Sequence, residues 1–356
     1  MSKKIYFIVP YPYQEAPSQR FRFEQYFDFL EANGFEVEIY PFINHSTWKT
    51  LYGEGKILKK ALGILMSFVR RFALLFKLHK ADYIFIHREA AHIGPPIFEW
   101  IIAKVLRRKY IYDFDDAIWL PNYSESNANF HRLKAYWKVR YCMEWASQIT
   151  AGNAYLAEYA RQYNQNVQII PTTIDTENHH NIMTNQESPE LTIGWTGTHT
   201  TMHYLDELVP VLKKLEQKYA FTFLVISNQS NDYDLKSLKF VKWDKQTEIE
   251  DLAKINIGVM PLKQDIWSEG KCGFKGLQYM ALEIPTIMSP VGVNSTIVEN
   301  GVNGFLAESH EEWYELLEKL IVDKQLRFQI GKGGKLRIDE VYSVLANQEK
   351  FLELFV

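Results

Sequence analysis

Short runs of β-branched and aromatic residues alternate along the chain with longer amphipathic stretches, and the alternation occurs twice. In the first half the runs predict strands at 4–9, 35–40, 82–86, 109–113 and 167–170, with helices near 19–33, 56–80, 92–107, 126–146 and 153–163. In the second half they predict strands at 191–195, 221–226, 240–243, 255–260 and 285–288, with helices near 200–218, 246–253, 274–282 and 310–321. Strands that alternate with helices are typical of βαβ units and a parallel sheet. We therefore expect an α/β protein with two doubly wound, Rossmann-like domains.

The boundary between these domains is expected in a polar stretch near the middle of the chain. The 356 residues suffice for roughly two domains of about 150 residues each. Periodicity fades over 171–190, where Pro, Thr, Asn, His and Gln predominate. We expect a first domain at 1–171 and a second at 172–339. Open parallel sheets bind ligands outside the carboxyl ends of their strands, so functional residues are expected in post-strand loops facing a cleft between the domains.

Composition narrows the class of protein. The chain is 47% hydrophobic and contains two cysteines, Cys142 and Cys272, in no metal-ligand spacing. This pattern argues against a disulfide framework or a zinc site and indicates a cytoplasmic, reducing environment. No apolar stretch of about 18 residues predicts a membrane span. Residues 1–170 carry 22 Lys and Arg against 16 Asp and Glu, whereas the remainder carries 18 against 27. The basic half is the better candidate to meet an anionic partner, and no nucleic acid is expected.

The strongest local motif follows the first strand of the second half. Residues 191–201, LTIGWTGTHTT, run from an apolar strand through two glycines to the start of a helix. Gly194 and Gly197 would let the backbone approach a phosphate closely. The helical amides at His199 and beyond, with the hydroxyls of Thr198, Thr200 and Thr201, would donate hydrogen bonds to it. The spacing leaves an alternative open, in which Thr198 or Thr200 is only an N-cap.

A second glycine-rich loop opens the helix expected at 274–282. Gly273 and Phe274 stand at the helix start, and Lys271 and Lys275 flank them. Cations at a helix N-terminus oppose the helix dipole unless an anion joins them. This conflict points to an anion-binding function, and the alternative is a pair of solvated lysines.

Several runs in the second half resemble a known family. The run QYMALEIPT at 278–286 precedes a predicted strand, and SPVGVN at 289–294 and ENGVNGFL at 299–306 follow it. In order and spacing these resemble the GT-B-fold glycosyltransferases of the retaining family 4 type, the glycosyl transferases group 1. The resemblance extends over nearly all of 191–340. It is weaker in the first half, where PSQRFR at 17–22 and DFDDAIW at 113–119 carry it.

The resemblance implies a GT-B architecture whose second domain binds a nucleoside diphosphate sugar and whose first domain presents an acceptor hydroxyl. It implies no metal or other cofactor, and a last helix, about 340–356, that packs back on the first domain. The sequence departs from the family at its E-x7-E pair, because Gly270 and Gln278 occupy those positions and Glu269 is one residue out of register. Gln278 would hold the ribose, while Lys271 and Lys275 would neutralise the departing diphosphate.

Other candidate side chains also stand after strands. Ser227 and Trp243 end neighbouring strands on the donor side, where Trp243 would lie against the nucleobase, unless it only caps the core. On the acceptor side, Asp115 or Asp116 would orient the acceptor hydroxyl, or instead form a structural carboxylate cluster. The Asp-x-Asp spacing is compatible with a metal site, but two matching halves do not suit the metal-dependent GT-A enzymes.

Two further acceptor-side candidates come from the first half. Arg20 follows the loop after the first strand and would face an anionic group or form a surface ion pair, and His87 follows the third strand. His87 is a rival for the acceptor-side base, with a structural histidine as the alternative.

The segment 56–80 contains seven Lys and Arg and no acid. At about 100° per residue most of these cluster on one helical face and apolar residues fill the others. Such a helix can lie on an anionic membrane surface. The alternative is a helix that covers the sheet and turns a basic back to solvent.

The sequence thus predicts a metal-independent retaining glycosyltransferase for surface polysaccharide or glycolipid synthesis. The protein is expected in the cytoplasm, with a peripheral position at the inner face of the membrane as one alternative. A nucleotide-sugar 2-epimerase of the same framework is an alternative, and an epimerised nucleotide sugar formed without acceptor would reveal it. A non-catalytic nucleotide-sugar-binding protein is a third, and it would bind donor without turnover.

Overall fold

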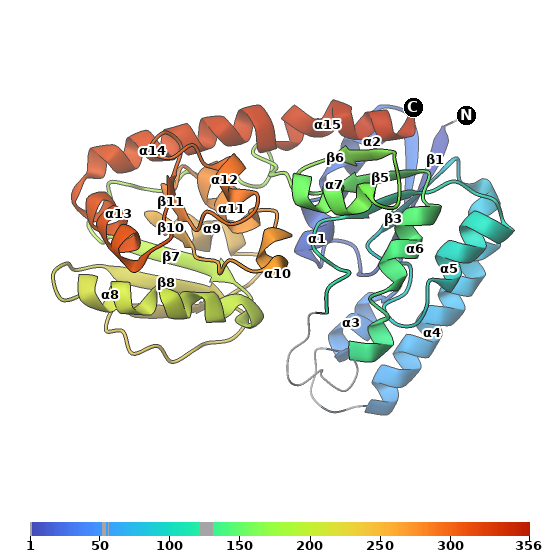
Figure 1. The fold of residues 1–356 in the computed structure, drawn as a ribbon, viewed down its shortest axis with the longest axis horizontal. Coiled ribbons are helices and arrows are strands. Elements are labelled where there is room, and N and C mark those ends of the chain that lie inside the picture. Colours follow the sequence, from blue (N-terminus) through green and yellow to red (C-terminus); the bar gives the residue numbers. More distant parts are fainter. Residues whose placement is uncertain (1, 52–54, 56, 122–130) are drawn as a thin grey trace. The chain divides into compact units, whose positions relative to one another are not determined.

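The computed structural model describes residues 2–51, 55, 57–121 and 131–356 of the chain. It consists of two compact units, Met1–Thr172 with Gln348–Val356 (unit 1) and Thr173–Asn347 (unit 2). Each unit contains a parallel six-stranded sheet flanked by helices (Figure 1). The expected α/β class with two doubly wound sheets is confirmed.

The sheet of unit 1 has the strand order β2-β1-β3-β4-β5-β6. Its strands are β1 (Lys3–Val9), β2 (Phe35–Pro41), β3 (Tyr83–His87), β4 (Ile111–Phe114), β5 (Gln148–Ala151) and β6 (Val167–Ile169). The sequence predicted all of these except β5, a four-residue strand with only one large apolar side chain. β3 and β4 pair in parallel and place His87 opposite Asp113 at their carboxyl ends.

The helices of unit 1 pack around an aromatic core. They are α1 (Pro17–Arg20), η1 (Glu24–Tyr26), α2 (Phe27–Ala32), α3 (His45–Leu51), α4 (Ile57–Leu75), η2 (Leu78–Lys80), α5 (Ile97–Trp100), η3 (Ile101–Val105), η5 (His131–Lys134), α6 (Lys138–Trp145), α7 (Ala154–Arg161) and η8 (Glu353–Phe355). Phe7 of β1 contacts the rings of Phe23, Phe85 and Phe355. The last residues of the chain therefore complete the core of unit 1. The first part of the helix expected at 126–146 lies outside the described residues.

Helix α4 has the opposite orientation to the one expected of a core-covering amphipathic helix. Its buried side chains include Ser67, Arg71 and Leu74, whereas most of its apolar side chains are exposed. The buried guanidinium of Arg71 donates hydrogen bonds to the carbonyls of Val9 in β1, Tyr40 in β2 and Ala90 in the loop after β3. Arg71 is therefore not part of a solvated basic back, whereas Lys59, Lys77 and Lys80 are exposed beside the exposed apolar side chains. Lys56 lies outside the described residues.

The sheet of unit 2 has the strand order β12-β11-β10-β7-β8-β9. Its strands are β7 (Thr192–Gly197), β8 (Thr222–Ser227), β9 (Leu238–Lys242), β10 (Ile257–Met260), β11 (Thr286–Met288) and β12 (Phe305–Leu306). The two-residue strand β12 is too short to give a periodic signal and was not predicted. All neighbouring strands are parallel, so their carboxyl ends lie at one edge of the sheet.

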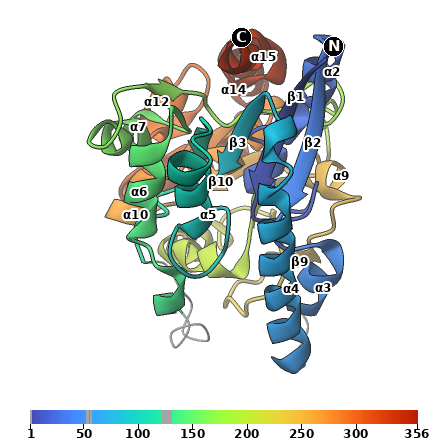
Figure 2. The ribbon, with the colours of Figure 1, turned by 90° about the vertical axis from the view of Figure 1, so that its right-hand side faces the viewer.

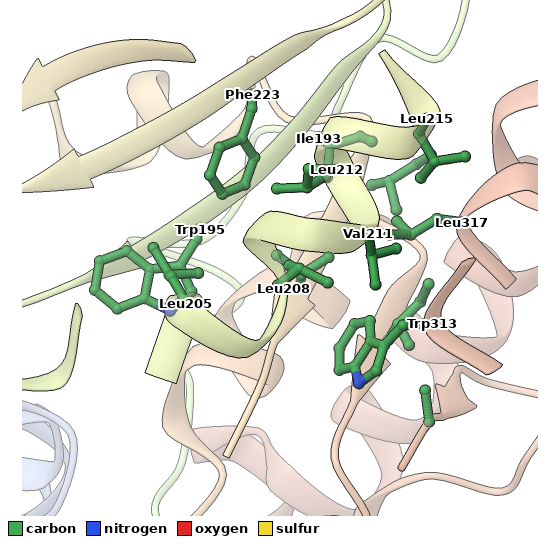
Figure 3. Close-up of a cluster of buried hydrophobic side chains, with 14 of the residues drawn as sticks. Ile193, Trp195, Leu205, Leu208, Val211, Leu212, Leu215, Phe223, Trp313 and Leu317 are labelled. Atoms are coloured by element: carbon green, nitrogen blue, oxygen red, sulfur yellow. The ribbon is translucent and has the colours of Figure 1, made fainter. Parts of the chain in front are cut away.

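The helices of unit 2 enclose a large apolar core. They are η6 (His199–Glu207), α8 (Val209–Leu215), α9 (Glu248–Leu252), α10 (Ile266–Glu269), α11 (Phe274–Ala281), α12 (Asn294–Ile297), α13 (His310–Val322), α14 (Lys324–Arg337), η7 (Ile338–Tyr342) and α15 (Val344–Leu352), whose last residues belong to unit 1. Figure 3 shows how side chains of η6 and α8, including Leu205 and Leu212, meet Trp195 and Phe223 of the sheet and Trp313 of α13. The single helix expected at 200–218 is two elements, because Pro210 lacks the amide that a continuous helix would need there.

No helix within the described parts of the chain combines the length and apolar character needed to cross a membrane.

Candidate functional site

The turn after β7 brings the first candidate motif of unit 2 to the carboxyl edge of the sheet. Thr198 is the N-cap residue of η6, and its hydroxyl lies 2.7 Å from that of Thr200. Thr198, His199 and Thr200 are all exposed, and the amide of His199 donates to Asn228 Oδ1 over 2.9 Å. The Thr198 side chain makes no capping bond to the helix backbone. The Thr198 hydroxyl therefore does not accept the backbone hydrogen bond that defines a structural N-cap.

Helix α11 begins beside this turn. Gly273 is its N-cap residue, with φ of 68°, and Phe274 is its first residue and half-buried. The helix is fixed to β7 because the Tyr279 hydroxyl accepts a hydrogen bond from the Thr196 amide over 2.8 Å. Lys275 Nζ consequently lies 3.5 Å from Thr201 Oγ1 and 5.1 Å from the centre of the Trp195 ring. The two glycine-bearing turns therefore adjoin in space.

Gly197 allows this close approach. A Cβ atom at this position would lie 2.6 Å from Trp195 Cζ2 and 2.8 Å from Lys275 Cε. Both distances are shorter than real Cβ contacts allow, so any side chain here would displace the indole ring or the lysine.

Lys275 is electrostatically unusual. Its side chain is half-buried, and none of the described carboxylates forms an ion pair with it. Desolvation, and then the nearby positive charge of Lys271, lower the pKa of Lys275 to about 7. A lysine in this state gains from any anion that comes within reach.

The neighbouring candidates have different surroundings. Lys271 is half-buried with Nζ 4.6 Å from the centre of the Trp267 ring. Glu269 ends α10, and its carboxylate accepts a hydrogen bond from Gln264 Nε2 over 2.8 Å. Gln278 is buried, and its Nε2 lies 3.3 Å from Nε2 of the buried His180. The amide expected to hold a ribose is thus already engaged within unit 2.

Ser227 and Trp243 stand at the ends of β8 and β9. Ser227 is fully buried, and its hydroxyl lies 3.4 Å from Asn228 Oδ1. Trp243 packs against a buried apolar cluster and donates from Nε1 to Glu248 over 3.3 Å. These contacts favour the core-capping alternative for Trp243.

In unit 1, the first carboxylate of the DFDD run is a buried hub. Asp113 accepts hydrogen bonds from Arg22, from Thr150 Oγ1 at 2.7 Å and from His87 Nδ1 at 2.7 Å. Burial by itself would raise the pKa of Asp113, but Arg22 and the bond from His87 outweigh burial and hold that pKa well below its usual range. Asp113 thus joins β3, β4, β5 and the segment between α1 and η1.

The next residues surround the other face of His87. Asp115 is half-buried and accepts from Arg88 Nε over 2.6 Å, and it lies 3.9 Å from His87 Nε2. Burial opposes ionisation of Asp115, but the Arg88 charge lowers its pKa overall. His87 is fully buried, and its Nε2 is among the described buried atoms without a hydrogen-bond partner. With Nδ1 donating to Asp113, Nε2 is the free acceptor of the ring.

The remaining acceptor-side candidates are placed differently. Asp116 is half-buried, and its carboxylate accepts from the Ala117 amide over 3.1 Å. Arg20 is buried, and its guanidinium lies 4.9 Å from the centre of the Phe21 ring. In the described part of the chain no group of three or more His, Cys, Asp or Glu side chains is arranged to hold a metal ion.

Of the residues that shape these sites, the sequence predicted a role for Thr201 but not for Trp195, Tyr279 or Asn228. Trp195, Thr201 and Tyr279 position Lys275, and Asn228 fixes His199 through two contacts. The LTIGWTGTHTT run gave the signal for Thr201. Tyr279 gave none, because an aromatic residue inside a helix usually indicates only core packing.

Comparison with known proteins agrees with this geometry. Residues 190–323 match the family described as Glycosyl transferases group 1. No curated protein sequence matches the chain. Among solved structures, sucrose-phosphate synthase from Thermosynechococcus elongatus is similar at TM-score 0.70 and 15% identity, with 99% of this chain and 98% of that chain covered.

Two further structures have the same overall fold. Anabaena HepE in complex with UDP-glucose is similar at TM-score 0.64 and 15% identity, covering 99% of this chain and 98% of that chain. WaaG, a glycosyltransferase involved in lipopolysaccharide biosynthesis, is similar at TM-score 0.66 and 13% identity, covering 99% of each chain. At these identities the similarity establishes the fold.

Proposed function

We propose that the protein is a retaining glycosyltransferase that uses a nucleoside diphosphate sugar, because residues 190–323 match the glycosyl transferases group 1 family and the chain has the GT-B fold. The observation that carries the proposal is Lys275. Its half-buried ammonium group has no paired carboxylate among the described residues and stands beside Gly197 and the Thr201 hydroxyl. A diphosphate is the anion that such a site would complement.

In this mechanism the bond between the anomeric carbon and the diphosphate oxygen breaks while the acceptor oxygen bonds to that carbon. Negative charge develops on the diphosphate, and Lys275, Lys271 and the amides after β7 stabilise it. The acceptor proton leaves with the departing diphosphate. Since ammonium and amide groups supply the stabilisation, we propose that the reaction needs no metal ion.

For the acceptor side we assign Asp115 the role of orienting the hydroxyl. Arg88 keeps Asp115 ionised, and a carboxylate with a depressed pKa is a good hydrogen-bond acceptor but a weak base. Asp113 is unsuited to this role because Arg22, His87 and Thr150 already occupy its oxygens.

The class of acceptor is inferred from the similar structures. HepE binds UDP-glucose, and WaaG acts in lipopolysaccharide biosynthesis. We propose a glycan or lipid-linked acceptor in surface polysaccharide or glycolipid synthesis, with the protein attached peripherally to the inner face of the membrane.

The proposal is tested by thermal-shift measurements with UDP-, GDP- and ADP-sugars, each with and without EDTA. A donor should raise the melting temperature equally in both conditions, because ligands of the native state stabilise it. A shift that requires a divalent metal would refute metal independence. Retention is tested by nuclear magnetic resonance of the product, whose anomeric configuration should equal that of the donor. An epimerised nucleotide sugar formed without acceptor would instead establish an epimerase.

A further inference from the structure

The solvent-facing side of α4 is apolar along the whole helix. At about 100° per residue, its outer third contains only apolar residues. They are Leu58, Leu62, Leu65, Met66, Val69, Phe72 and Ala73, with Phe76 directly after the helix. Leu58 and Phe76 are exposed at 87% and 81%, at opposite ends of the row. A contiguous apolar surface of this extent marks an interaction site in a folded protein.

The apolar row continues onto α5, which lies beside α4 (Figure 2). The ring of Phe72 lies 4.8 Å from that of Phe98, measured between centres. Between the helices is an open pocket of about 310 Å³, to which Ile97 and Leu133 also contribute. Ile97, Leu133 and Trp100 are themselves partly exposed. We call the outer third of α4, this pocket and the exposed edge of α5 the apolar face.

Positive charge borders the apolar face. Lys59 and Lys77 project from one flank of the apolar row, and Lys80 follows it, all three exposed. The segment 57–80 carries six Lys and Arg and no Asp or Glu. Arg71 does not belong to this border, because it is buried and bonded to main-chain carbonyls.

We propose that the apolar face of unit 1 docks on an anionic lipid bilayer, with α4 lying in the plane of the interface. Leucine and phenylalanine side chains enter the acyl boundary, and Lys59, Lys77 and Lys80 contact anionic headgroups. A second copy of the chain is a poorer occupant, since a two-fold contact would bring the basic borders of both copies together. The inference rests on the proposed function only for its biological setting, because docking requires neither donor nor acceptor.

The test is flotation of the full-length protein with vesicles of phosphatidylcholine alone or with 30% phosphatidylglycerol, in buffer without nucleotide. The protein should float with the anionic vesicles and much less with the neutral ones. Raising the salt concentration should weaken binding without abolishing the apolar contribution. Equal flotation with both vesicle types, or none with the anionic ones, would overturn the proposal.

Matched pairs of variants distinguish lipid binding through the apolar face from nonspecific binding by any exposed leucine. Leu62 and Leu65 are each 59% exposed on α4, while Leu336 and Leu345 are 58% and 57% exposed on helices of unit 2. The double variant L62Q/L65Q should lower partition into anionic vesicles by about tenfold or more. L336Q/L345Q should partition like the wild type. Equal losses in both variants would contradict the assigned face.

A charge variant keeps the test decisive if L62Q/L65Q folds poorly. K59Q/K77Q should reduce binding to anionic vesicles by about 30-fold, since each of the two headgroup contacts contributes about 1 kcal/mol. K236Q/K239Q, which removes two exposed lysines of unit 2, should not. Light scattering without lipid should show the same particle mass for wild type and K59Q/K77Q. A lipid-free dimer that K59Q/K77Q alters would assign the face to self-association instead. Donor binding, measured separately without vesicles, reports whether the proposed function fails.

Discussion

Replacing Lys275 by methionine should weaken donor binding and at the same time stabilise the fold. The pKa of Lys275 is about 7 in the free protein, first because of desolvation and then because of Lys271, against an ordinary value of 10.5. The unfolded chain therefore binds more protons than the folded one between pH 7 and 10.5, so the contribution of Lys275 to stability rises with pH across that window. A neutral methionine avoids the desolvation altogether.

The size of the effect follows from the shift. Each pKa unit corresponds to about 1.4 kcal/mol, which sets an upper limit of about 5 kcal/mol for Lys275 at pH 7. Because solvent still reaches part of the side chain, we expect K275M to raise the free energy of unfolding by about 1–2 kcal/mol. Urea denaturation at pH 7 measures this, with K239M, at an exposed lysine of β9, as the unchanged control.

Donor binding should depend on the protonation of the Lys275 ammonium group. A bound diphosphate should return the pKa of Lys275 toward its ordinary value, so binding takes up a proton above pH 7. The protonated fraction of free Lys275 falls about 25-fold between pH 6.5 and 8.5, and the donor affinity should fall in proportion. Isothermal titration calorimetry of UDP-glucose in two buffers of different ionisation enthalpy counts the protons. A constant affinity over this range with no proton uptake would refute the reasoning, as would a K275M variant that binds donor normally.

Three further substitutions test the framework of the sites. Gly197→Ala places a Cβ 2.6 Å from the Trp195 ring and should lower the free energy of unfolding by about 1–3 kcal/mol, measured in urea, together with donor affinity. Asp113→Asn leaves the buried Arg22 charge unbalanced and should lower the free energy of unfolding by about 3–5 kcal/mol. In the wild type the contribution of Asp113 to stability is present above pH 4 and disappears on acidification, which unfolding measured as a function of pH would show. Arg71→Leu removes three buried hydrogen bonds to main-chain carbonyls and should lower the melting temperature although the replacement is apolar.

The sequence predicted most of the fold because the strands of both sheets are strongly apolar runs separated by amphipathic stretches. The exceptions have local causes. β5 and β12 are too short or too weakly apolar to be periodic, and Pro210 divides a helix that looked continuous. The adjacency of Lys275 to the turn after β7 was also accessible, since parallel strands bring their following loops to one edge.

The partners of individual side chains were beyond the sequence. Gln278 contacts His180, which stands 98 residues earlier, and Asp113 binds Arg22 from 91 residues away. Such pairs depend on how distant elements pack, which periodicity does not encode. The sequence left α4 open between a membrane-surface helix and a sheet-covering helix for a related reason. A helical wheel gives two faces, but it does not reveal that main-chain carbonyls can draw Arg71 inward and leave the leucines outside.

Lys275 and α4 each depart from the usual preferences of a folded chain, and the two departures have a common physical interpretation. A cation with a depressed pKa at a helix N-terminus and an apolar row facing water both raise the free energy of the isolated protein. Local rules fail in natural proteins chiefly at functional sites, where a ligand removes the conflict. A diphosphate would restore the charge of Lys275, and an anionic bilayer would cover the leucines while attracting Lys59 and Lys77. Each conflict therefore disappears with a partner bound, which is why we expect K275M and L62Q/L65Q to lose binding without losing the fold.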